Sequence, residues 1–387
     1  MATIIIGRAV VDGRLLEDAR VIIDGGTIHY AGPAEGAPYV PASAEEIIHS
    51  GLILPGLIDI HNHGGGGIGF PDAMDADDAR TAIAEHARHG TTTLVASLVT
   101  AAHATLLERI GTLAPLVRGG ELAGIHLEGP HISQARRGAH DPELIRPGSV
   151  GALKELLDAG DGTIVTMTLA PEDPQVDPMS EALIEAGALP SYGHTDCSAY
   201  QMLEAIAFSL QAGAIPTATH LFNGMRPIHH RDAGPAFACL DASARGDMVV
   251  ELIADGVHTS ADTVRFVFDL AGEDMVLLIT DAMAATGMTD GSYRLGSLDV
   301  TVADGTARLT HGGSIAGGTA HLLDVVRFAV RDAGVDLGQA VRAASSTPAR
   351  ALGLSDRGAL STGLRADVVL TDGDLRPERV MRAGQWI

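Results

Sequence analysis

The sequence predicts an α/β protein in which a (β/α)8 TIM-type barrel carries a small β-sandwich domain. Two observations predict this fold class. From Leu52 onward, short apolar runs alternate with amphipathic helical segments, which is the βαβα pattern of a parallel barrel. The two chain ends instead contain short β-rich runs separated by tight turns. A hydrophobic fraction of 46% with only 3% aromatic residues implies a core built from aliphatic side chains.

The two chain ends, residues 1–51 and 355–387, are expected to form the small β-sandwich domain together. Residues 3–33 alternate β-rich runs with Gly and Asp-Gly turns, and residues 363–387 repeat this pattern. Such turns join antiparallel strands. Because neither end is long enough to bury a core alone, we expect their strands to pair.

Residues 52–354 are expected to form the barrel, because eight strand–helix units fit this length. The strands are predicted at residues 52–61, 91–99, 122–129, 163–170, 189–195, 217–224, 248–256 and 275–282. The clearest helices are predicted at residues 76–89, 104–117, 199–211, 261–270 and 321–333. A β-hairpin is also expected at 293–310, either as an insertion at the barrel mouth or as an addition to the small sheet.

Charge and cysteine content restrict the class of partner. The net charge of −23 argues against a nucleic-acid or anionic-membrane partner, although a local cluster of Arg and His could still bind a small anion. No apolar run reaches the ~20 residues of a membrane-spanning helix. The only cysteines, Cys197 and Cys239, form no CxxC pair and follow no secretory segment. We therefore expect a soluble cytoplasmic protein with two reduced, buried thiols.

Potential metal ligands follow the predicted barrel strands. His61 and His63 end the first strand, and residues i and i+2 of a strand point to the same side. Neutral imidazole is a good ligand for zinc and its first-row neighbours. The other strand ends supply Glu128, His194, His220, His258 and Asp281. Each has an ordinary structural explanation alone, but active sites of such barrels lie at this end, so their conjunction predicts a metal centre.

These segments also resemble a known family. PGLIDIHNHG, HLEGPH, GHTD, THLFNGM, ADGVH and ITDAM are similar in order and spacing to the N-acetylglucosamine-6-phosphate deacetylases of the amidohydrolase superfamily. The resemblance implies that Glu128 is the central metal ligand and that His194 and His220 complete the main site. His61 and His63 would hold a second ion with Glu128, giving one or two divalent ions per subunit. The ligands do not distinguish Zn, Fe, Mn and Co.

Lys154 is the only lysine, and it limits the subtype. Many binuclear amidohydrolases bridge their metals with a carboxylated lysine at a strand end. Lys154 lies in the helix-like segment ALKELL, so it cannot be that bridge. A bridging anion must then be a carboxylate, and Glu128 lies at the appropriate strand.

The expected chemistry is amide hydrolysis. A metal-bound water has its pKa lowered towards ~7. Asp281 would take its proton during attack on the acetamide and pass it to the departing amine. His140, in RRGAH, could support the sugar or the developing oxyanion. The resemblance implies that His258 contacts the substrate.

Phosphate recognition is expected around residues 223–231. Asn223 and Gly224 resemble the backbone phosphate donors of the family, and the loop RPIHHR supplies Arg226 and Arg231. Guanidinium matches phosphate oxygens. The resemblance places an Arg at Arg231 and contributes it from a neighbouring subunit, which implies a homodimer. The flanking HHRDAGP departs from the family pattern, so the choice between the two arginines stays open.

The predicted function is therefore deacetylation of N-acetylglucosamine 6-phosphate, a small anionic amino sugar, to glucosamine 6-phosphate and acetate. One alternative is another amidohydrolase that acts on a cyclic amide or deaminates a small substrate, for which a phosphate-binding loop would be unnecessary. A non-catalytic scaffold is a second alternative, but such a relative would be expected to lose ligands that this chain retains.

Overall fold

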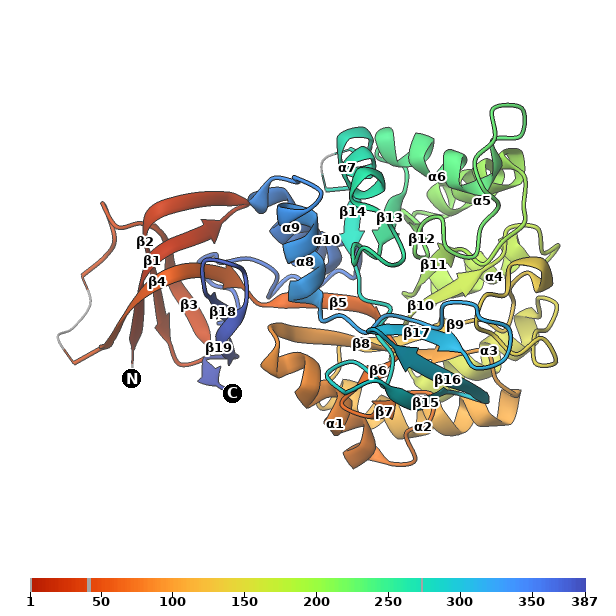
Figure 1. Cartoon of the computed structure of the whole chain (residues 1–387), viewed down its shortest axis with the longest axis horizontal. Coiled ribbons are helices and arrows are strands. Elements are labelled where there is room, and N and C mark those ends of the chain that lie inside the picture. The colour runs from red at the N-terminus through yellow and green to blue at the C-terminus, as the bar shows by residue number, and fades with distance from the viewer. Residues whose placement is uncertain (1, 40–42, 273) are drawn as a thin grey trace.

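The computed structural model describes residues 2–39, 43–272 and 274–387. Figure 1 shows two parts: a curled sheet that contains both chain termini, and a larger barrel surrounded by helices. Helices α8, α9 and α10 lie between them. They span Leu322–Arg331, Leu337–Ala343 and Ser346–Ala351.

The chain ends form one seven-stranded sheet with the order β20-β19-β18-β4-β1-β2-β3. Its strands are β1 (Thr3–Val11), β2 (Arg14–Asp24), β3 (Thr27–Pro33), β4 (Glu45–Pro55), β18 (Val368–Thr371), β19 (Pro377–Arg382) and β20 (Gln385–Trp386). The sheet folds over, because the edge strand β3 exchanges backbone hydrogen bonds with the segment before β18, at Ile28 with Gly363 and Leu364. The enclosed core is aliphatic and includes Ile5, Val21, Ile53 and Val368.

The barrel is an eight-stranded parallel sheet with the order β14-β13-β12-β11-β10-β9-β8-β5. Its strands are β5 (Leu57–Asn62), β8 (Thr91–Val99), β9 (Gly124–Glu128), β10 (Ile164–Leu169), β11 (Leu189–Tyr192), β12 (Thr217–Ala218), β13 (Val249–Leu252) and β14 (Val276–Leu278). Backbone bonds from Asp281 to His61 and from His63 to Ala282 join the ends of the sheet. This closure brings the first and last strands, with their ligand candidates, side by side.

Helices cover the outside of the barrel (Figure 1). They are α1 (Ala76–Arg88), α2 (His103–Arg118), α3 (Val150–Gly160), α4 (Val176–Glu185), α5 (Ala199–Gln211), α6 (Gly234–Ala244) and α7 (Ala261–Leu270), with a 3-10 turn, η1, at Gln134–Arg136. Local chemistry fixes several starts. The Asp75 carboxylate accepts from two backbone N–H groups of α1, and Ser198 and Gln201 form a capping box at α5.

A three-stranded antiparallel sheet lies at the barrel mouth. It comprises β15 (Gly291–Leu295), β16 (Leu298–Ala303) and β17 (Thr306–Leu309). Leu295 and Val300 pack with Val99, which ends β8, and with Met283 in the segment after β14. The short hairpin β6 (Gly64–Gly65) and β7 (Ile68–Gly69) follows β5.

The structure confirms the predicted fold class and refines two details. The predicted first barrel strand is divided: β4 pairs with β1 and β18 in the chain-end sheet, and only β5 belongs to the barrel. The chain thus leaves the chain-end sheet and enters the barrel at Gly56, not at residue 52 as predicted. At Gly56 a Cβ atom would lie 2.2 Å from the Thr92 hydroxyl. The expected hairpin at 293–310 is a separate sheet of three strands. None of the described helices is both long and apolar enough to cross a membrane.

Candidate metal centre

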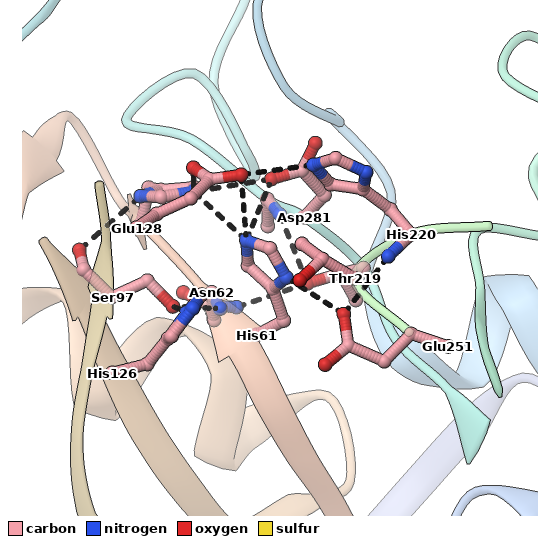
Figure 2. A network of polar contacts seen from close by, with 12 residues as sticks. His61, Asn62, Ser97, His126, Glu128, Thr219, His220, Glu251 and Asp281 are labelled. Atoms are coloured by element: carbon pink, nitrogen blue, oxygen red, sulfur yellow. Dashed lines mark hydrogen bonds and ion pairs between the residues drawn. The ribbon is translucent and has the colours of Figure 1, made fainter. Parts of the chain in front are cut away.

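Glu128, at the end of β9, lies at the centre of the predicted ligand set. Its Oε1 is 3.0 Å from His194 Nε2 and 2.9 Å from His220 Nε2. Its Oε2 is 3.2 Å from His63 Nε2, whereas His61 Nε2 lies 3.7 Å from Oε1. Figure 2 shows Glu128 above His61, with His220 and Asp281 beside it. The sequence expectation that these side chains converge is therefore met, and each carboxylate oxygen faces a different set of imidazoles.

The second nitrogen of each imidazole determines what the first can do. Nδ1 of His63 faces the Ser97 carbonyl at 3.2 Å, and Nδ1 of His194 faces the Arg136 carbonyl at 2.8 Å. A carbonyl accepts only, so these Nδ1 atoms carry a proton, and Nε2 is the nitrogen that a metal ion would bind. The arrangement gives convergent Nε2 donors.

His140 has the opposite tautomer. Its Nδ1 accepts a hydrogen bond from the Thr100 backbone N–H at 3.3 Å, so Nε2 carries the proton and points at Glu128 Oε2, 3.4 Å away. Burial lowers the pKa of His140 to about 4, which keeps the ring neutral. His140 is thus a buried neutral hydrogen-bond donor facing the centre, which suits an oxyanion contact better than a metal ligand.

Electrostatics within the centre favour charged carboxylates. Burial opposes ionisation of Glu128, but His140 and His61 hold its pKa well below the usual range. Asp281 is likewise buried, and its hydrogen bond with His63 keeps its pKa far below the ordinary value. Burial would lower the pKa of His63, but Asp281 and Glu128 raise it to about 9. The acids and imidazoles therefore stabilise one another's charges.

Asp281 reaches the centre from the segment after β14. Its Oδ1 lies 3.2 Å from His63 Nε2 and 3.5 Å from His61 Nε2. Asp281, His194 and His220 all have left-handed backbone conformations, with φ of 50°, 45° and 26°. Such backbone conformations are strained for residues other than glycine, and they occur often at functional sites.

A cavity of about 300 Å³ opens onto the centre. This is the lower end of the size range of small-molecule sites. Its walls include His63, Glu128, His194, His220 and Asp281, and also His140, Asn223, Gly224, His258, Leu295, Ser314 and Ile315, but not His61. The insertion at the barrel mouth thus supplies Leu295 to the cavity. At Gly224, φ is +61° and a Cβ atom would lie 2.8 Å from His194 Nδ1, so glycine lets the loop approach this imidazole.

Two predicted substrate residues have defined partners in this cavity. His258 donates from Nδ1 to Asp255 Oδ2 at 2.7 Å, and although burial would lower its pKa, Asp255 raises it. Asn223 donates its side-chain amide to the His220 and Leu221 carbonyls at 3.3 Å. The amide therefore braces the loop that follows His220.

Neither predicted arginine lines the cavity. Arg226 donates to Asp232 at 2.8 Å and to the Cys197 carbonyl at 2.6 Å, and its Nε lies 3.5 Å from Asp196. Its guanidinium is therefore engaged within the subunit. Arg231 is exposed, and its Nη1 contacts the His230 ring at 2.8 Å. The two arginines, between which the sequence left the choice open, therefore differ in their partners within the subunit.

Sequence reasoning missed two buried residues of the centre. Glu251, in β13, accepts from His61 Nδ1 at 3.0 Å. His126, two residues before Glu128, bonds to the hydroxyls of Ser97 and Thr168, both at 2.9 Å. Two features of the sequence could have indicated them. Glu251 is a charged residue within the apolar run VVELIA, and His126 lies two residues before a ligand candidate. Lys154, by contrast, is exposed on α3, as the sequence indicated.

The donor set fits a divalent first-row metal. Three groups of donor atoms here lie within 4.8 Å of one another: His61 with His63 and Asp281, His61 with Glu128 and His220, and Glu128 with His140 and His194. Imidazole and carboxylate ligands are typical of zinc sites and equally accept Fe, Mn or Co.

Comparisons with known proteins agree with this geometry. A mutant of N-acetyl-D-glucosamine-6-phosphate deacetylase from Mycobacterium smegmatis, solved with N-acetyl-D-glucosamine-6-phosphate, is 42% identical, with a TM-score of 0.92 over 100% of this chain and 99% of that one. N-acetylglucosamine-6-phosphate deacetylase of Bacillus subtilis (strain 168) is 34% identical over 84% of this chain and 81% of its own length.

A third relative, N-acetylgalactosamine-6-phosphate deacetylase of Escherichia coli O157:H7, is also 34% identical, over 86% of this chain and 87% of its own. The model of the amidohydrolase family matches residues 52–387, which include the whole barrel. With its ligand candidates at the strand ends and this match over most of its length, the chain belongs to the amidohydrolase family.

Proposed function

We propose that this amidohydrolase removes acetate from N-acetylglucosamine 6-phosphate and yields glucosamine 6-phosphate. The observation that carries the proposal is the convergence of Glu128, His194, His220 and Asp281 at one cavity, in a chain whose relatives are sugar-phosphate deacetylases. An amide hydrolase needs an activated water, a proton carrier and a donor for the developing oxyanion. The cavity supplies a residue for each task.

Glu128, His194 and His220 would hold the main divalent ion, and His61 and His63 with Glu128 a second. Such an ion, when bound, supplies Lewis acidity, which lowers the pKa of water towards ~7 and polarises the amide carbonyl. Asp281 would accept the proton of the attacking water and return it to the amine as the C–N bond breaks. Neutral His140 would donate from Nε2 to the carbonyl oxygen, and His258 would position the sugar.

Phosphate binding is assigned to the Asn223–Gly224 backbone and to Arg231. Arg226 is bound by Asp232 and the Cys197 carbonyl, so it is the weaker candidate. Because Arg231 is exposed and does not line the cavity, we infer that it serves the site of a neighbouring subunit in a homodimer. A sugar-phosphate substrate and two buried, reduced thiols support a cytoplasmic enzyme.

Acetate release from N-acetylglucosamine, with and without the 6-phosphate, tests the reaction. Turnover confined to the phosphorylated sugar is expected from metal-replete enzyme. Equal turnover of both sugars would keep the hydrolase and discard the phosphate loop. No release from either would favour a cyclic-amide substrate. N-acetylgalactosamine 6-phosphate, assayed in parallel, reports the sugar epimer.

Arg231→Gln and Arg226→Gln separate the two arginines. Loss of the phosphate ligand should raise KM much more than it lowers kcat. We expect this pattern for Arg231→Gln, whereas Arg226→Gln should mainly loosen the loop. An equal loss of kcat and kcat/KM in Arg231→Gln would reject its assignment to phosphate.

A further inference from the structure

Glu251 is a buried carboxylate for which the proposed reaction has no use. It lies in β13 with 1% of its surface exposed. Its Oε2 accepts from His61 Nδ1 and from the backbone N–H of His220, both at 3.0 Å. Figure 2 shows His61 between two acids, with Glu128 on one side of the ring and Glu251 on the other. One carboxylate oxygen therefore ties ligand candidates of two different strands.

The partner of His61 differs in kind from those of the other imidazoles. Nδ1 of His63 and Nδ1 of His194 face neutral carbonyls. Nδ1 of His220 has no hydrogen-bond partner among the described residues. Among the Nδ1 atoms of the ligand candidates His61, His63, His194 and His220, only that of His61 donates to a carboxylate. A carboxylate behind a ligating imidazole fixes its tautomer, orients the ring and increases its basicity.

The orientation of His61 matters because its Nε2 lies between the two candidate ion positions. This atom is 3.2 Å from His63 Nε2, 3.5 Å from Asp281 Oδ1 and 3.7 Å from Glu128 Oε1. The His194 and His220 pair reaches Glu128 without it. A change at Glu251 should therefore act on the His61–His63 position first.

We propose that Glu251 is a positioning residue that holds His61 as the Nδ1–H tautomer, and that occupancy of the His61–His63 position by a second ion depends on it. The inference rests on the proposed metal-dependent function. Glu251 would thus set the number of ions that the chain binds. The site of Glu128, His194 and His220 would bind its ion without Glu251, whereas the site of His61 and His63 would need Glu251 to bind a second ion.

Titration of metal-free protein with Co²⁺, followed by visible absorption and by metal analysis after dialysis, tests the inference without substrate. Wild type should bind two ions per chain. Glu251→Gln keeps an acceptor oxygen of the same shape but removes the charge, so we expect one ion with unchanged affinity and a second weakened about 10- to 100-fold. Glu251→Ala should lose the second ion entirely.

Thr168→Val is the matched control, because the buried Thr168 hydroxyl bonds to His126 and Thr219 and to none of the ligand candidates. It should bind two ions like the wild type. Two ions of wild-type affinity in Glu251→Gln, equal weakening of both ions, or a single ion in the wild type would each overturn the proposal. If Glu251→Ala fails to fold, Glu251→Gln still decides. Selective loss of the second ion in a protein without deacetylase activity would sink the proposed function alone.

Discussion

Two clusters of histidines and acids lie in the described part of the chain, and they differ in geometry. The first is the centre around Glu128. The second joins Glu85 of α1 to His89 and to His321, which precedes α8, and its donor atoms also lie within 4.8 Å of one another. By composition alone, both clusters could hold a metal.

Geometry separates the two clusters. The His89 and His321 rings stack at 3.6 Å with an angle of 17°. An ion cannot lie in the planes of two parallel rings at this separation. One nitrogen of each ring is also engaged: Nε2 of His321 bonds to Glu85 Oε1 at 3.0 Å, and Nδ1 of His89 bonds to the Glu85 carbonyl at 2.8 Å. Around Glu128, by contrast, the Nε2 atoms converge while the Nδ1 atoms of His61, His63 and His194 are bonded elsewhere.

We therefore expect the second cluster to stabilise the fold. It joins α1 to the start of α8, and Gly287 packs against it so closely that a Cβ atom would lie 2.2 Å from Glu85 Oε1. Next to it, His86 donates to the Gly64 carbonyl at 2.9 Å, in the glycine run that follows His63. The comparison teaches that the mutual orientation of the imidazoles, convergent around Glu128 and stacked beside Glu85, distinguishes two clusters of similar composition.

The largest expected effect is on catalysis at the first cluster. Asp281→Asn removes the proton carrier, so kcat for acetate release should fall by about 10³-fold, within the usual range for general acid–base groups. The unfolding midpoint and the binding of an ion by Glu128, His194 and His220 should stay close to wild type. A loss of less than tenfold would contradict the role of Asp281. His321→Asn, assayed in parallel, should retain most of the activity.

A pH-dependent loss of stability is expected from His86, beside the second cluster. Burial lowers the pKa of His86 to about 4, and its Nδ1 has no partner among the described residues. The unfolded chain, with the ordinary histidine pKa of ~6.5, takes up the proton first. The stability is thus complete above ~6.5 and is lost as the pH falls towards 4, by up to about 3 kcal/mol.

Urea unfolding of wild type and His86→Gln at pH 7 and pH 5 checks this prediction. The wild type should lose more free energy of unfolding between the two pH values than the variant does. Asp59, whose pKa burial raises to about 6, acts in the opposite direction in both proteins, so the difference between them isolates His86. An equal loss of unfolding free energy in both proteins would show that protonation of His86 does not destabilise the folded state.

A smaller effect is expected from His321→Asn. The change leaves the carboxylate of Glu85 without one of its partners, so the free energy of unfolding should fall by about 2 kcal/mol. Arg88, 2.6 Å from Glu85 Oε2, limits the loss. Thermal unfolding measures the change. A loss of bound metal in this variant, with little loss of stability, would reverse the assignments of the two clusters.

The smallest effect is expected from His89→Gln, which should leave metal binding unchanged. The variant should bind as many ions as wild type in the same Co²⁺ titration, because His89 faces Glu85 and His321 rather than the centre. One ion fewer than wild type would mean that the second cluster also holds a metal.

The sequence determined the architecture and the position of most ligand candidates at one end of the barrel. Alternating apolar runs and amphipathic segments predicted the barrel, because each strand must be covered by a helix. The rule that barrel sites lie at the carboxyl ends of strands then placed His61, His63, Glu128, His194, His220 and Asp281 together. Strand periodicity predicted that His61 and His63 share a side, and their Nε2 atoms lie 3.2 Å apart.

The tertiary structure alone decided the partners of those residues. Glu251 meets His61 across 190 positions of sequence, and His140 takes its tautomer from the Thr100 backbone. Arg226 and Arg231 look equivalent in the sequence, but a neighbouring carboxylate and a carbonyl engage only the first. Likewise, the Glu85 cluster has the composition of a metal site but stacked rings. Local patterns set which residues reach a strand end, whereas the direction of a lone pair depends on contacts that only the closed barrel creates.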